Sequence, residues 1–339
     1  MKIFIPTSFV GFLLMFSACV STDVLDSPDD GKVSENIVLD LMSEDRASTK
    51  AHDGFTLRYV AKIYQKDGNN WGSAPYDRKE ILEGGTNKII FSVPANNSYK
   101  IILFADYIPS GSEKTGECYR DYYYNTVNPL QTTNQRFVGI RTNPGDDSQT
   151  LSPEFFNNDN YDCFFASTEV YKDQNELVEK ITLKRLCAKV YIQDISPNSG
   201  ECEVTVSKLG VNPRYDYDNN TTTTTPSSTF DTQRFNTLLS DKVNVTADNK
   251  ELLYFYTLAY DQSSTVGIEI NVNNAGKTKS TKITQIPVRQ NYKTIVTGEF
   301  VDASPVSDIP GIGDQDPQEG DIILDLSVDD NWIQTPLAS

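Results

Sequence analysis

The sequence has very little histidine and lacks the short motifs that mark common enzyme sites. His52 is the only histidine, and it stands in a polar segment. A lone histidine of this kind is far more often inert than a general base. The sequence has no CxxC, HExxH, GxGxxG or GxxxxGK[ST] motif, so it lacks the residue patterns for a zinc site or a phosphate-binding loop. We therefore expect no enzyme, no metal site and no cofactor.

Positive charge is also scarce. The chain has 30 Lys and Arg against 47 Asp and Glu, which gives a formal net charge of −17. A surface this acidic repels the phosphates of nucleic acids and of anionic lipids. We expect no nucleic-acid partner, and we read the charge itself as favouring solubility.

Long apolar runs are missing except near the start. The stretch from Phe4 to Phe16 is too short to span a membrane and ends in Ser17-Ala18-Cys19, as in a secretory signal. The placement resembles a bacterial lipobox, in which cleavage before Cys19 leaves a lipidated N-terminus; the alternative is an ordinary signal with a chance cysteine. We expect a signal peptide at 1–18, a lipidated acidic tether at 19–35 and anchoring of the acylated cysteine in outer-membrane lipid.

No segment has a convincing helical period, whereas alternation of apolar and polar residues is widespread. Phe55, Leu57, Tyr59, Ala61 and Ile63 show it. Turn residues interrupt the alternation about every ten residues, which is typical of all-β sandwiches. Further strands are expected at 89–93, 99–107, 164–170, 181–192, 203–209, 252–259, 266–272, 281–288 and 293–301.

The length of the chain predicts more than one domain. Roughly 320 mature residues exceed what one core usually supports. We expect two tandem β-sandwich domains of transthyretin or immunoglobulin-like Greek-key type, at 36–180 and 181–302. The segment 303–320 is rich in Pro, Gly and Asp and predicts a linker, which leaves 321–339 as a separate terminal strand.

A ten-residue pattern occurs near both ends of the chain. NIVLDLMSED at 36–45 returns as DIILDLSVDD at 321–330 with five identities. The residues that alternate as in a half-buried strand are Ile37, Leu39 and Leu41 in the first copy and Ile322, Leu324, Leu326 and Val328 in the second. The match has two equally good explanations. One is chance, or two edge strands that look alike because they cover similar sheets; the other is donor-strand exchange. In donor-strand exchange, the last strand of one subunit fills the place vacated by the first strand of another.

Four cysteines remain besides Cys19, and an exported protein can form disulfides. Cys187 and Cys202 fall on consecutive predicted strands, which makes them the candidate pair. Buried free thiols are the alternative.

Several strings resemble the Bacteroidales-type fimbrillin superfamily. They are Leu57-Arg58-Tyr59-Val60, Phe104-Ala105-Asp106-Tyr107, Tyr123-Tyr124-Asn125-Thr126, Asp162-Cys163-Phe164-Phe165-Ala166-Ser167, 182–190 (TLKRLCAKV) and Arg289-Gln290-Asn291-Tyr292-Lys293-Thr294. The resemblance implies a lipoprotein with two β-sandwich domains that assembles into a surface fimbria after an Arg-specific protease removes its leading segment. Other fimbrial subunits, including copies of the chain itself, would be its partners. By the same resemblance the cut would fall between Arg46 and Ala47, and a fimbrial anchor or tip subunit that does not polymerise is the alternative.

A surface lipoprotein that binds glycans is a further alternative, because exposed aromatic rings can stack on sugars. Trp71, Tyr76, Tyr119 and the run Tyr122 to Tyr124 supply candidate rings. In a strand, however, Tyr122 and Tyr124 face one way and Tyr123 the other, so the spacing does not favour a flat platform.

Overall fold

The structure is a computed structural model of the chain. It describes residues 34–41, 53–84, 88–126, 137–146, 151–196, 200–212, 214–216, 221–223, 239–246, 250–260, 264–301 and 325–329. Within these ranges the secondary structure is nearly all strand, and the only helices are two short 3-10 turns, η1 (Pro153–Phe155) and η2 (Asp159–Tyr161). The predicted all-β fold is confirmed. No helix in the described ranges is long and apolar enough to cross a membrane.

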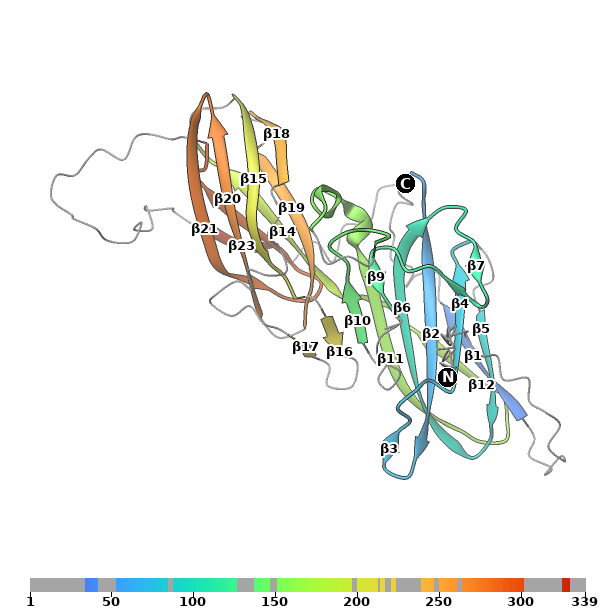
Figure 1. The fold of residues 1–339 in the computed structure, drawn as a ribbon. Coiled ribbons are helices and arrows are strands. Elements are labelled where there is room, and N and C mark those ends of the chain that lie inside the picture. The colour runs from blue at the N-terminus through green and yellow to red at the C-terminus, as the bar shows by residue number, and fades with distance from the viewer. Residues whose placement is uncertain are drawn as a thin grey trace, which may run out of the picture.

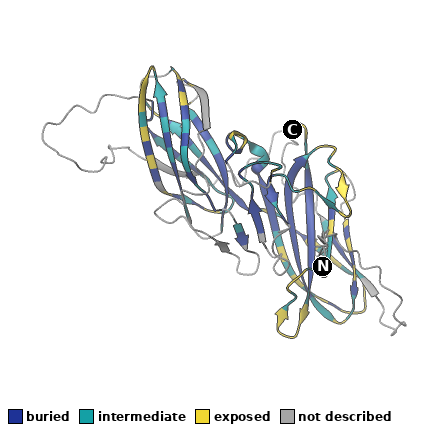
Figure 2. Ribbon diagram, in the orientation of Figure 1, coloured by how far each residue is buried: buried dark blue, intermediate teal, exposed yellow. Residues whose placement is uncertain are grey.

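The first half of the chain is built on a large antiparallel sheet with the strand order β13-β11-β6-β2-β3, and β4 also pairs with β2 (Figure 1). Its strands are β2 (Phe55–Asp67), β3 (Asn70–Trp71), β4 (Asp77–Leu82), β6 (Asn97–Pro109), β11 (Cys163–Lys172) and β13 (Lys184–Arg185). The two long central strands, β2 and β6, are buried on both faces over most of their length (Figure 2). They form the centre of the core.

A second sheet in this half has only three strands, in the order β12-β1-β5. They are β1 (Ser34–Leu41), β5 (Lys88–Pro94) and β12 (Leu177–Ile181). Buried side chains of all three strands belong to the same apolar cluster as those of β2 and β6. The sheet therefore covers one face of this core, and the first described strand of the chain is its middle strand.

The second half contains two four-stranded sheets, which form two layers in Figure 1. One has the order β19-β14-β22-β23 and the other β18-β15-β20-β21. Their bounds are β14 (Cys187–Asp194), β15 (Gly200–Gly210), β18 (Leu239–Val245), β19 (Glu251–Leu258), β20 (Ser264–Asn274), β21 (Lys277–Val288), β22 (Lys293–Gly298) and β23 (Asp325–Asp329). Apolar side chains of both sheets are buried, as a β-sandwich requires.

The two halves also share structure. The strands β16 (Arg214–Asp216) and β17 (Thr221–Thr223) come from the second half of the sequence, yet they extend a sheet with β10 (Phe137–Ile140) and β9 (Tyr124–Asn125) of the first half. One contiguous cluster of buried apolar side chains runs through both halves. The boundary between residues 180 and 181 stays a prediction. A small separate hairpin joins β7 (Lys114–Thr115) and β8 (Cys118–Tyr119).

Two local predictions are corrected. The single strand expected at 181–192 is divided among β12, β13 and β14, which belong to three different sheets. The strands expected from the sequence leave 128–162 without one, yet this segment contains β10, and in its described parts Leu151, Phe155, Phe156 and Tyr161 are buried. Alternation could not reveal these residues because they enter the core from short turns, not from a strand.

Candidate functional site

The candidate site is the position of β1 between β5 and β12. The strand β1 runs antiparallel to β5, with Ile37 opposite Phe91, and parallel to β12, with Ile37 beside Leu177. Neither β5 nor β12 pairs with the other, so β1 alone connects them within this sheet. Because neighbouring strands lie about 4.8 Å apart, removing β1 would leave two edges roughly 10 Å apart. We call this space between β5 and β12 the β1 slot.

The inner side of the slot is apolar and closed to solvent. The side chains of Ile37 and Leu39 are completely buried. On β5 their partners Phe91 and Ile89 are buried as well. The predicted apolar alternation of the first strand is therefore present, and these side chains fill the core face of the slot.

The outer side of the slot carries an ordered pattern of neighbours. Val38 lies between Ile90 of β5 and Val178 of β12, and both of these neighbours are about half exposed. Two residues further along, Asp40 lies between Lys88 of β5 and Lys180 of β12. The slot thus presents an apolar position and then a basic position to the outward side chains of its occupant.

The last described strand lies elsewhere, on its own chain. The strand β23 pairs antiparallel with β22, with Leu326 opposite Val296 and Val328 opposite Thr294. Val296 and Thr294 are both buried. In this arrangement β23 is the edge strand of a sheet in the second half, and the described part of the expected donor segment pairs with its own chain.

Several predicted site residues fall outside the described residues: Cys19, Arg46, Ala47, Ile322 and Leu324. Leu41 is described only through its backbone, which pairs with Ile181. The same holds for Leu326 and Val328, whose backbones belong to β23. Their predicted roles therefore stay predictions.

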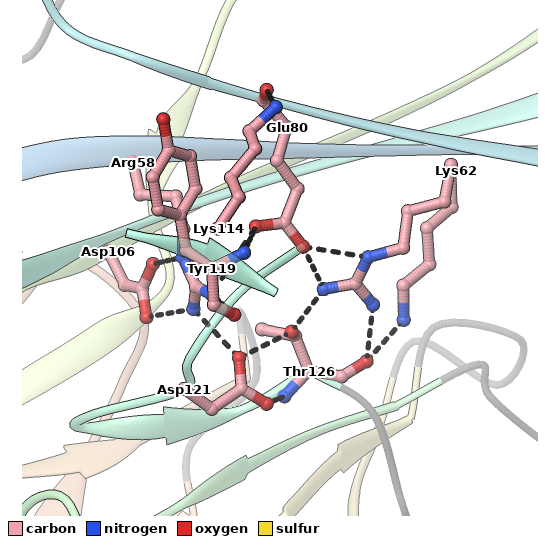
Figure 3. A network of polar contacts seen from close by, with 9 residues as sticks. Arg58, Lys62, Glu80, Asp106, Lys114, Tyr119, Asp121 and Thr126 are labelled. Carbon is pink, nitrogen blue, oxygen red and sulfur yellow. Dashed lines mark hydrogen bonds and ion pairs between the residues drawn. The ribbon is translucent and has the colours of Figure 1, made fainter. Parts of the chain in front are cut away.

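A buried network of charges stabilises the sheet on which the slot rests (Figure 3). Arg58 on β2 donates two hydrogen bonds to the carboxylate of Asp106 on β6, at 2.9 and 2.8 Å. The same guanidinium lies 2.9 Å from Asp121 and 3.6 Å from Glu80. Burial alone would lower the pKa of Arg58, but attraction by Asp106 and Asp121 outweighs it and raises the pKa.

The network continues through Arg78 and Thr126. Arg78 donates a hydrogen bond to the hydroxyl of Thr126 at 2.8 Å and forms an ion pair with Glu80. The backbone N–H of Thr126 donates to Asp121 at 2.7 Å, and the ammonium of Lys62 donates to the Thr126 carbonyl at 2.5 Å. These contacts tie β2, β4, β6 and the segment leading to Thr126 into one unit, and none of the residues named in them lies on β1.

Lys62 is the unusual member of this network. It is completely buried, and burial together with repulsion by Arg78 lowers its pKa from the ordinary 10.5 to about 7. Strand alternation from the sequence places Arg58 and Lys62 opposite the apolar face of β2, where solvent would be expected. Nothing in the sequence indicates directly that this second face is also buried.

The candidate disulfide is not present. Cys187 is on β14 and Cys202 on β15; these strands follow one another in the sequence but belong to different sheets, and both cysteines are unbridged. The Cys187 thiol instead donates a hydrogen bond to Asp162 at 3.2 Å. Burial raises the pKa of Cys202 to about 11, so this thiol stays protonated near neutral pH.

The tyrosine run considered for glycan binding is packed against the core. Tyr123 and Tyr124 are buried, and Tyr122 packs edge-to-face against Tyr123. Among the candidates, Tyr76 is the ring with a large exposed fraction, and its edge meets the buried ring of Tyr99. Core packing therefore accounts for the tyrosine run. No group of three or more potential metal ligands occurs among the described residues.

Comparison with solved structures finds distant similarity over most of the chain. A structure from Bacteroides eggerthii, named as a candidate cell adhesion protein, is 14% identical with a TM-score of 0.48, covering 88% of this chain and 96% of that one. A candidate polysaccharide-binding protein from Bacteroides thetaiotaomicron is 10% identical with a TM-score of 0.44, covering 78% and 91%. A fimbrial assembly protein from Parabacteroides distasonis is 11% identical with a TM-score of 0.36, covering 79% and 92%.

No protein with a curated description matches the chain. The model of a family of unknown function, DUF6562, matches residues 28–334. Since the match spans most of the sequence, the chain belongs to this family.

Proposed function

We propose that the chain is a structural subunit of a cell-surface fimbria that supports adhesion and assembles by donor-strand exchange. The observation that carries the proposal is the position of β1. It is the middle strand of its sheet, it is the first described strand of the chain, and it alone joins β5 to β12. Its loss would open an apolar slot that only another strand can refill with matching hydrogen bonds.

Proteolysis is the proposed switch. Arg46 stands five positions beyond the end of β1, and cleavage there separates this strand from the body. Before the cut, β1 belongs to the same chain as its slot, so its effective concentration is on the order of millimolar and exceeds that of any incoming strand. After the cut this advantage is lost. The proposed partners are thus an Arg-specific protease and other fimbrial subunits.

The second copy of the ten-residue pattern is the proposed donor. Ile322, Leu324, Leu326 and Val328 would supply the alternating apolar side chains that the slot takes from Ile37, Leu39 and Leu41. Each buried side chain contributes about 1.5 to 3 kcal/mol before the cost of ordering the strand is subtracted. That cost makes the equilibrium gain modest, so slow peeling of the strand would have to supply most of the durability of a filament.

The proposed location follows from the first residues. A lipidated Cys19 would hold the subunit in the outer membrane during export, and the acidic segment behind it would separate lipid from fold. The cut after Arg46 would also release the body from this anchor.

The proposal is tested with three chains on denaturing gels without heating. The first begins at Val20, the second is the same protein cut after Arg46, and the third is cut likewise but ends at Gly320. A ladder of oligomers from the second chain alone is the expected result. Monomers from all three would overturn the proposal.

A subunit that ends or anchors the fimbria without polymerising is the second candidate. The observation that favours it is the pairing of β23 with β22 of the same chain. If β23 stays there after the cut, the slot can accept a strand from another subunit, but the chain cannot donate one. In that case the cut chain would bind one added donor strand and form no ladder.

A further inference from the structure

The outward positions of the β1 slot differ from one another in their neighbours, whereas its inward positions are all apolar. Core positions accept any strand with apolar residues at alternate places, and such a strand fits equally well when shifted by two residues. The outward positions differ from one another: Ile90 and Val178 flank the first, and Lys88 and Lys180 flank the second. A strand is therefore distinguished by its outward residues.

We propose that Lys88 and Lys180 select the donor strand and set its register by pairing with Asp325 of the incoming subunit. This inference rests on the proposed function and adds how the slot selects a particular donor strand and its register. The occupant is the segment 321–330 of a second copy, running antiparallel to β5 and parallel to β12. Each residue of this segment takes the place of the residue 285 positions earlier in the sequence.

In this register each outward position finds a suitable neighbour. Ile323 takes the place of Val38 between the two half-exposed apolar residues, and Asp325 takes the place of Asp40 between the two lysines. The identity of Asp40 and Asp325 is one of the five in the repeated pattern. Residues directly opposite on neighbouring strands have their Cβ atoms about 5 Å apart, close enough for such pairs to attract.

The neighbouring registers lose both matches. A shift of two residues in one direction puts Asp325 between Ile90 and Val178 and gives the lysines Ser327. A shift in the other direction puts Gly320 at the buried place of Ile37. Of these three registers, only the proposed one places a carboxylate between Lys88 and Lys180.

Charge reversal tests the selection. The variant Asp325→Lys, purified uncut and then cut after Arg46, should assemble about tenfold more slowly than the parent chain, because two attractive pairs become repulsive. The variant D40K/K88D/K180D/D325K reverses all four charges and should restore the rate. Asp316→Lys makes the same charge change in the linker and should leave the rate unchanged.

Cysteine cross-linking tests the register itself. Both variants below carry Cys118→Ser, because that thiol is the least buried of the four beyond residue 19. The pair Ile90→Cys with Ile323→Cys should join cut subunits by a reducible bond. Ile90→Cys with Asp321→Cys should not, because residue 321 meets Ile90 only in a shifted register, and this second pair leaves Asp325 in place.

The two proposals fail in different ways. A parent chain that forms no ladder overturns the proposed function and this inference with it. A ladder whose rate is the same with Asp325→Lys, or cross-links from the second cysteine pair, overturns only the selection by the lysines.

Discussion

At the scale of single residues, the most informative feature is the buried charge network on β2. Its anions and cations are matched so closely that Arg58, Glu80 and Asp106 can all be buried. Charges removed from water are tolerated only with such partners, so the network holds its strands in one arrangement and is sensitive to the loss of any member. If β1 leaves, the remaining strands of the first half can stay folded only if contacts such as these hold them together without β1.

The first prediction concerns Arg58. Replacing it in Arg58→Leu leaves Asp106 and Asp121 buried without their main partner, and should lower the free energy of unfolding by about 3 to 5 kcal/mol. Urea unfolding followed by tyrosine fluorescence measures this. Lys79→Met, on the exposed side of β4, is the matched control and should change the stability by less than about 0.5 kcal/mol. Equal effects of the two changes would contradict the role given to the network.

The second prediction concerns the pH dependence that Lys62 confers. Its pKa is about 7 in the folded chain and 10.5 in the unfolded chain, so between these values the unfolded chain binds the extra proton. Stability should therefore rise with pH across this window, by at most ~1.4 kcal/mol per pH unit from this group. Urea unfolding at pH 7.5 and pH 9.5 should show this rise in the parent and a smaller one in Lys62→Met. An equal rise in both would show that Lys62 is not its source.

At the scale of elements, β1 differs from the other strands of the first half because it belongs to the core without being part of the network that supports it. Its inward residues Ile37 and Leu39 are buried, and its pairing to β5 and β12 supplies the rest of its attachment. The large sheet built on β2 and β6 has its own ladder and its own charges. We therefore expect β1 to separate from a body that stays folded.

The third prediction tests this separation in the uncut chain. Leu39→Asp puts a carboxylate at a fully buried position and should release β1, because an unpaired charge there costs several kcal/mol. Amide hydrogen exchange of Ile89 to Val93 on β5 should become fast, while exchange of β2 and β6 stays slow. Asn36→Asp, at a partly buried position of the same strand, is the control and should leave all of these rates unchanged. Simultaneous loss of protection throughout the first half would contradict the independence of β1.

Some of these elements could be predicted from the sequence, and some of their contacts could not. Alternating strands such as β5, β11 and β20 could be predicted because a single face of apolar residues determines their period. The burial of Arg58 and Lys62 could not, since it depends on partners on β4 and on the segment 119–126 that meet β2 only in the fold. The lysines beside Asp40 were missed for the same reason: Lys88 and Lys180 are far apart in the sequence and become neighbours only through β1.

At the scale of the whole molecule, the two copies of the ten-residue pattern occupy different sheets at different ends of the chain. The first is the middle strand of a sheet in the first half, and the described part of the second is the edge strand of a sheet in the second half. Exchange between subunits therefore requires two steps. After cleavage, β1 must leave β5 and β12, and β23 must separate from β22. This predicts that assembly is limited by whichever release is slower.

The fourth prediction isolates the second release. The double variant Val296→Cys with Leu326→Cys joins opposite positions of β22 and β23, and its oxidised form should hold the donor strand on its own body. After the cut, this form should give no ladder, and adding a reductant should restore assembly. A ladder from the oxidised form would show that β23 is not the strand that is exchanged.

The measurement that tests the central claim most directly is binding of the donor segment to the empty slot. The chain that begins at Val20 and ends at Gly320 is cut after Arg46, mixed with a synthetic peptide of residues 321–330, and followed by amide hydrogen exchange of β5 and β12. Donor-strand exchange predicts that the cut makes these amides exchange fast and that the peptide protects them again, whereas a peptide with Leu324 and Leu326 replaced by Asp does not. Amides that the cut leaves protected, or that both peptides protect equally, would contradict it.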